Sequence, residues 1–164
     1  MKHTEHETNH TQSDADINEQ LQFVTFNLGD EEYAIEILRV QEIIRMIPIT
    51  RVPNSPEFIN GVINLRGKVI PVMDLGKRIG LPDKEKNNDN RIIVVEINHT
   101  IIGFIVDRVN IVLRVSKNII ENTPQLVGNL DTEYIKGIAK MEHNLLILLD
   151  LDKVMEPQEL ALTM

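Results

Sequence analysis

The sequence contains no cysteine among its 164 residues. Disulfide bonds, thiolate metal sites and cysteine nucleophiles are therefore excluded, and the composition fits a reducing compartment. Tryptophan is also absent, and aromatic residues make up only 4% of the chain. Grooves that bind polyproline ligands are lined by aromatic side chains, so the composition does not favour a protein that reads PxxP motifs.

Long hydrophobic runs are missing as well. The longest apolar runs have the length of a strand, far below the roughly twenty residues that span a membrane. The first residues are polar and do not predict a secretory signal. We therefore expect a cytoplasmic protein without direct membrane insertion. The formal net charge of −8 also argues against a nucleic-acid partner, because a phosphate backbone is bound by basic surfaces.

Sequence signatures of common catalytic sites do not occur, neither a phosphate-binding glycine loop nor a nucleophile or zinc-protease motif. His99 and His143 each lie in a predicted turn, where we expect them to be solvated rather than catalytic. Asp74 and Asp150 would serve acid–base chemistry only if they met in one cleft. Capping of a helix N-terminus explains both without that condition. We predict no enzymatic activity, no cofactor and no metal site.

What the sequence does contain is an internal repeat. Residues 59–77 align without a gap with residues 135–153, and residues 23–46 align with residues 92–115. Most matches pair one apolar residue with another, so chance similarity between strands is the alternative. Both pairs keep their order and register, which favours a duplicated β module of about sixty residues. Two modules cannot form a solenoid, so they must close on themselves or on each other.

The runs between turn residues are short and apolar, which is typical of small barrels or a sandwich. Some runs, such as residues 92–95 and 145–149, are apolar on both faces, so both faces must be covered. We therefore expect two barrels that share a hydrophobic layer. Each half ends in Asp-Leu, which predicts short helices over residues 74–79 and 150–155.

The predicted organisation has five parts. Residues 1–20 form a polar, disordered tail, residues 21–82 barrel one, residues 83–90 a polar linker, residues 91–157 barrel two and residues 158–164 a C-terminal tail. His3, His6 and His10 lie in the first tail, where weak metal binding is the alternative to a tail without ligand geometry.

The two halves differ at a few charged positions. Glu42 aligns with Ile111, and Arg66 aligns with Glu142. Drift at exposed positions explains such differences, and so does a surface that only the first half uses for binding. The sequence leaves these two explanations open.

Five segments in order resemble the CheW-like family of bacterial chemotaxis coupling proteins. They are VQEI at residues 40–43, FINGVINLRG at 58–67, VMDL at 72–75, GFIVDRV at 103–109 and YIKG at 134–137. The resemblance runs from about residue 21 to 155. It implies an all-β fold of two intertwined SH3-like five-stranded β-barrels with a shared hydrophobic core and short helices. Relatives that carry kinase or receiver domains are longer, so a free-standing coupler is favoured.

The resemblance implies a non-catalytic adaptor that links methyl-accepting chemotaxis receptors to the regulatory domain of the histidine kinase CheA. A receptor helix would lie on an apolar floor with a charged rim. The floor is assigned to Val40, Gly103 and Val112, and the rim to Glu42 and Arg66. The kinase face is assigned to Ile49, Val52, Pro53 and Gly61, in a proline-containing segment that suits an edge strand or an exposed loop. The alternative is a β-barrel that binds a small ligand or is an enzyme.

Overall fold

The computed structural model describes residues 19–121 and 132–155. The predicted N-terminal tail, which contains His3, His6 and His10, lies outside the described residues except for residues 19 and 20. The predicted C-terminal tail lies wholly outside them. The elements in chain order are β1 (Gln20–Leu28), β2 (Glu31–Glu36), the 3₁₀ turn η1 (Ile37–Arg39), β3 (Val40–Arg45), β4 (Ile59–Leu65), β5 (Lys68–Asp74), α2 (Leu75–Arg78), β6 (Arg91–Ile97), β7 (Thr100–Val106), β8 (Arg108–Ser116), η2 (Lys117–Ile119), β9 (Ile120–Glu121), η3 (Thr132–Tyr134), β10 (Ile135–Lys140), β11 (Leu145–Leu149) and α3 (Leu151–Val154).

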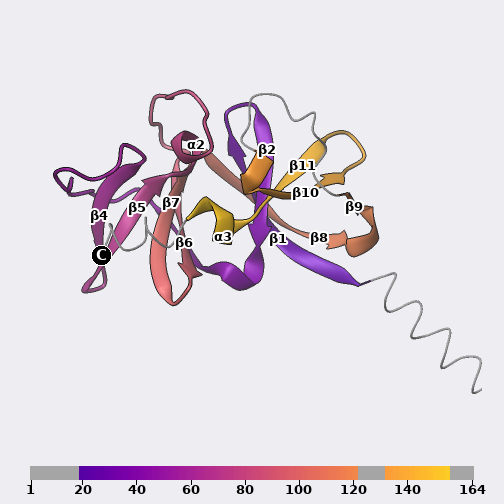
Figure 1. The fold of residues 1–164 in the computed structure, drawn as a ribbon, viewed down its shortest axis with the longest axis horizontal. Coiled ribbons are helices and arrows are strands. Elements are labelled where there is room, and N and C mark those ends of the chain that lie inside the picture. The colour runs from indigo at the N-terminus through magenta and orange to yellow at the C-terminus, as the bar shows by residue number, and fades with distance from the viewer. Residues whose placement is uncertain (1–18, 122–131, 156–164) are drawn as a thin grey trace, which may run out of the picture.

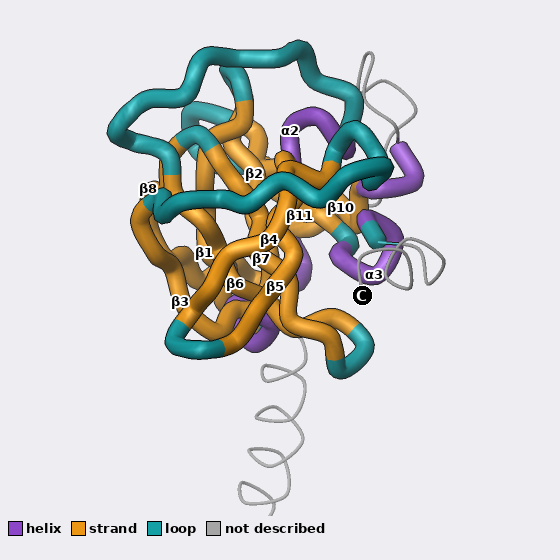
Figure 2. The backbone as a smooth tube through the Cα atoms, turned by 90° about the vertical axis from the view of Figure 1, so that its left-hand side faces the viewer, coloured by secondary structure: helices purple, strands orange, loops and turns teal. Residues whose placement is uncertain are grey.

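The strands form two sheets that lie side by side (Figure 1). The larger sheet has the order β8-β1-β2-β11-β10-β9, and the smaller has the order β3-β6-β7-β5-β4. Figure 2 views the molecule from the side of the smaller sheet, with β4 and β5 in front. The predicted all-β fold of two intertwined barrels with short helices is confirmed. The larger sheet has six strands rather than five, because the two-residue strand β9 pairs with β10.

Strand exchange intertwines the two sheets. β3 leaves the first half of the chain and pairs with β6, while β8 leaves the second half and pairs with β1. Parallel pairings of β2 with β11 and of β5 with β7 complete the mixing. Neither sheet therefore coincides with residues 21–82 or 91–157, because each sheet takes strands from both. The outer limits of the domain, at residues 21 and 157, stay a prediction.

The predicted repeat is visible in the backbone. β4, β5 and α2 have their counterparts in β10, β11 and α3, and a bulge interrupts both hairpins at Gly61 and Gly137. Each short helix begins after an aspartate that caps it. Asp74 accepts from the Lys77 amide at 3.2 Å, and Asp150 accepts from the Asp152 amide at 3.1 Å. Both predicted caps are confirmed, and each helix is one turn long.

The core is shared between the sheets, as predicted. On β6, Ile93 and Val95 belong to the large central cluster, whereas Ile92 and Val94 belong to a second cluster on the other face. β11 divides its side chains in the same way between the central cluster and a third one. Burying one such side chain contributes roughly 1.5–3 kcal/mol, so the exchange of strands lets two small modules use one larger core.

Candidate functional site

The turn between β4 and β5 presents the first charged residue of the candidate site. Arg66 and Gly67 both have positive φ, at 51° and 86°, as a two-residue hairpin turn requires. Glycine meets this requirement without steric cost, and the Gly67 amide donates to the side-chain oxygen of Asn64 at 2.9 Å. The backbone therefore fixes the position from which the Arg66 side chain leaves the sheet.

Arg66 forms a two-pronged ion pair with Glu42 of β3. Nη1 of Arg66 donates to Oε1 of Glu42 at 3.1 Å, and Nη2 donates to Oε2. The hydrogen bond from Arg66 lowers the pKa of Glu42, and the same bond raises the pKa of Arg66. The side chains keep 70% and 28% of their surface exposed. Solvent screens such a pair, so its contribution to folding is small.

A shallow cavity of about 190 Å³ lies beside this ion pair. Its other lining residues are Gln41, Leu65, Lys68, Ile70, Val94 and Ile101. The site thus combines a fixed charge pair with an apolar floor on strands β3 to β7. This arrangement suits contact with another protein surface more than enclosure of a small molecule.

The structure brings part of the predicted receptor set together. Val40 and Glu42 lie on β3, where Val40 packs against the central core, and Arg66 reaches Glu42 from the neighbouring hairpin. Val112 is 52% exposed but lies on β8, at the edge of the other sheet. The four residues therefore do not share one strand face.

The structure places Gly103 in the core of the smaller sheet. It is buried in the middle of β7, and a Cβ there would lie 2.7 Å from Cγ2 of Ile92 and 3.5 Å from Cγ2 of Val72. The lack of a side chain accommodates neighbours in the core rather than an approaching helix. Ala34 holds the equivalent position in the first half, so the requirement for glycine comes from the local packing.

The segment predicted as a kinase face is a loop. Ile49 packs against a core cluster, whereas Val52 is 42% exposed and Pro53 is exposed. Thr50 forms an isolated bridge with Val62. The loop continues past this bridge through the exposed residues 51–54, and Pro48 and Thr50 are exposed as well.

Gly61 allows that loop to lie against β4. Its φ is 145°, and a Cβ would collide with the carbonyl oxygen of Thr50. Both backbone bonds of the bridge, from Thr50 to Val62 and back, measure 2.8 Å. Gly61 therefore supports the loop from below and does not itself form an exposed contact point.

Asp74, one of the residues considered for catalysis, serves the fold. Asp74 caps α2 and also forms an ion pair with Lys86 at 2.9 Å. His99 lies in a hairpin turn with a φ of 66°. Among residues 19–121 and 132–155, no group of three or more His, Cys, Asp or Glu side chains could hold a metal ion. Within the same residues, no helix has the length and apolarity of a membrane span.

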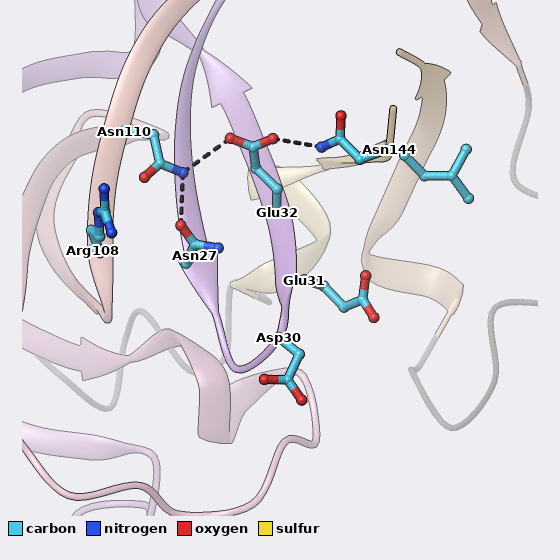
Figure 3. Close-up of a pocket in the computed structure, with 8 residues that line it drawn as sticks. Asn27, Asp30, Glu31, Glu32, Arg108, Asn110 and Asn144 are labelled. Atoms are coloured by element: carbon cyan, nitrogen blue, oxygen red, sulfur yellow. Dashed lines mark hydrogen bonds between the residues drawn. The ribbon is translucent and has the colours of Figure 1, made fainter. Parts of the chain in front are cut away.

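Sequence reasoning missed a polar network in the larger sheet (Figure 3). Glu32 accepts from Asn110 at 3.0 Å and from Asn144 at 2.9 Å, and Asn110 also donates to Asn27 at 2.7 Å. These residues come from β1, β2, β8 and the turn before β11, so no local sequence signal joins them. The network ties the exchanged strand β8 to its new sheet.

Comparison with known proteins gives consistent matches. The sequence profile described as the CheW-like domain matches residues 22–159. Chemotaxis protein CheW of Klebsiella aerogenes is 37% identical over 141 residues, covering 86% of this chain and 85% of that protein. Chemotaxis protein CheW of Bacillus subtilis is 37% identical over 144 residues, covering 88% and 92%. The crystal structure of the scaffolding protein TtCheW from Thermoanaerobacter tengcongensis matches with a TM-score of 0.78 and 42% identity, covering 85% of this chain and 90% of that one.

Proposed function

The chain belongs to the CheW-like domain family, and from this premise we propose that it is a scaffold that couples methyl-accepting chemoreceptors to the histidine kinase CheA. The observation that carries the proposal is the Glu42–Arg66 pair, held beside an apolar floor by two different elements. The protein performs no catalysis in this role. It acts only by binding its partners, which hold it at the cytoplasmic face of the membrane.

The receptor face consists of Val40, Glu42 and Arg66, with Gly103 packing beneath the floor. A receptor tip would place a helix on the apolar residues and a carboxylate near Arg66, since helices bind grooves through apolar anchors and charged rims. Val112, on the other sheet, would contact the same partner only if that partner spans both barrels.

The kinase face consists of the exposed residues Val52 and Pro53, with Ile49 and Gly61 holding their loop in place. This loop lies against β4, the edge strand of the smaller sheet. The regulatory domain of the kinase has the family fold, so a pseudo-symmetric contact between barrels is geometrically available.

The test is a purified three-component pull-down with receptor fragments and the kinase regulatory domain. Arg66→Glu should weaken receptor capture but leave kinase capture within roughly twofold, because the two faces use different residues. Arg114→Glu on β8 is the matched control, since it changes the net charge equally on the other sheet. Equal loss in both variants, or capture of neither partner by the natural chain, would contradict the proposal.

The alternative of a small-ligand-binding or enzymatic β-barrel has no specific observation in its favour among the described residues. A thermal-shift screen with nucleotides and metabolites tests it. A reproducible rise in melting temperature together with no receptor or kinase binding would favour that alternative.

A further inference from the structure

Two arginines face each other at the end of the smaller sheet. Arg45 on β3 and Arg91 on β6 are direct partners in the antiparallel register. Directly opposed residues have neighbouring Cβ atoms on one face, and like charges in this relation are unfavourable. A fold with 25 acidic residues against 17 basic ones has ample carboxylates with which to neutralise such a pair. It does not use them here.

No ion pair between a carboxylate and either arginine occurs within the described parts of the chain. Two other arginines do have a carboxylate partner. Arg39 binds Asp152 at 3.0 Å, and Arg66 binds Glu42. The repeat supplies a comparison too, because Arg114 is the counterpart of Arg45 and faces the neutral Gln22. The opposed arginine pair is therefore specific to one half.

Arg91 is held in a fixed position by the loop that precedes it. Its Nη1 donates to the carbonyl oxygens of Asn88 and Asn90, both at 2.8 Å. Asn90 is itself 3% exposed, and its side-chain Nδ2 donates to the backbone carbonyl oxygens of Val106 and Asp107 at 3.3 and 3.2 Å. A guanidinium anchored through one nitrogen keeps its remaining donors available in a defined direction.

These residues surround a surface cavity of about 390 Å³. It is lined by Arg45, Met46, Asn87, Asn88, Asn90 and Arg91. None of these residues lines the cavity beside Glu42 and Arg66. The lining offers two guanidinium groups and amide donors, with no acidic side chain, and Met46 adds an apolar wall.

We propose that this cavity is an anion-binding site that receives a carboxylate side chain from an acidic segment of a partner protein. Planar guanidinium groups match the two oxygens of a carboxylate, and the apolar Met46 suits the methylene stem of a glutamate. A phosphate group is the less favoured ligand, because the lining contains neither a helix N-terminus nor a glycine-rich loop. The proposal does not depend on the receptor and kinase assignments.

The experiment uses the full chain and a fluorescein-labelled hexaglutamate peptide at an ionic strength of about 0.1 M, where charges more than about 10 Å apart are largely screened, with binding followed by anisotropy. Arg45→Gln should weaken binding roughly fivefold or more, as loss of one charge-assisted contact predicts. Arg114→Gln lowers the net charge by the same amount and should change affinity less than about twofold, because screened charges at a distance contribute little. The melting temperature of Arg45→Gln should stay equal or rise, since a repulsive pair is removed.

Three results would overturn the proposal. Equal weakening in both variants would assign the binding to net charge alone. Unlabelled phosphate or pyrophosphate could displace the peptide at a lower concentration than an unlabelled glutamate-rich peptide does. The cavity would then be a phosphate site and not a carboxylate site. A fall in the melting temperature of Arg45→Gln would show that Arg45 serves the fold.

Discussion

The hairpin β4–β5 and the hairpin β10–β11 share one backbone plan and carry different chemistry. Both contain a bulge at a glycine, and both end in an aspartate cap before a one-turn helix. At the tip, Arg66 of the first hairpin is replaced by Glu142, and its partner Glu42 is replaced by the exposed Ile111. The fold is therefore complete without this ion pair in one of its halves, which favours a role in binding for the other.

The bulge glycines provide the strongest test of how equivalent the hairpins are. Gly61→Ala should destabilise the protein by about 3 kcal/mol, because the positive φ is strained for alanine and the Cβ meets a backbone carbonyl. Gly137→Ala should cost about 1 kcal/mol, since its φ is not positive and its neighbour β9 is a two-residue edge strand. Urea denaturation with a common m-value measures both. Equal losses would mean that the loop at Thr50 moves to accommodate an added Cβ as easily as β9 does.

Reversing the charge at Arg66 tests the proposed asymmetry directly. Arg66→Glu should leave the free energy of unfolding nearly unchanged, because the side chain is exposed and the twin position holds glutamate. Receptor binding should lose on the order of 2 kcal/mol, about thirtyfold, through lost attraction and new repulsion. Calorimetry and titration with a receptor fragment measure the two quantities. A large fall in stability would identify Arg66 as a residue of the fold.

The charge swap separates the ion pair from the partner contact. Glu42→Arg combined with Arg66→Glu restores an attractive internal pair with reversed polarity. If Arg66 contacts a receptor carboxylate, the double variant should remain within about threefold of the affinity of Arg66→Glu, because the outward charge is still reversed. Recovery of the natural affinity would instead assign the pair a purely structural role.

A buried hydroxyl distinguishes the halves inside the core. Tyr33 is fully buried, its hydroxyl has no hydrogen-bond partner in the described structure, and burial raises its pKa to about 12. The equivalent residue of the second half is the apolar Ile102. Tyr33→Phe should therefore stabilise the fold by about 1 kcal/mol, because the substitution removes an unpaired hydroxyl from an apolar site. Thermal unfolding measures the difference, and a destabilised variant would contradict the assignment.

The smallest expected effect is the pH dependence of the exposed ion pair. Arg66 lowers the pKa of Glu42, so the contribution of the pair is present above the unfolded-state pKa and is lost as the pH falls through the lower folded-state value. The difference in melting temperature between the natural chain and Arg66→Gln should therefore shrink toward zero in acid. Melting curves from neutral pH into the acidic range measure it. A difference that grows in acid would reverse the sign of the argument.

Signals in the sequence were sufficient to predict the strands and the helix caps of this protein. The apolar runs and the caps Asp74 and Asp150 depend on residues within a few positions of one another, and the repeat was found by comparing two segments of the sequence, so all three could be predicted without the fold. The doubly apolar run at residues 92–95 also predicted that both of its faces would be covered, as they are. Glu42 and Arg66 were singled out by the difference between the halves.

The tertiary structure alone decided which strands become neighbours. Nothing near β3 in the sequence specifies that it pairs with β6, because its exposed and half-buried positions fit either sheet edge. The opposition of Arg45 and Arg91 follows from that exchange, and the packing of Gly103 against Val72 follows from the parallel pairing of β5 with β7. Which strands pair depends on the apolar area that the two modules bury together. Each segment contributes only a part of that area, so no segment alone determines its neighbours.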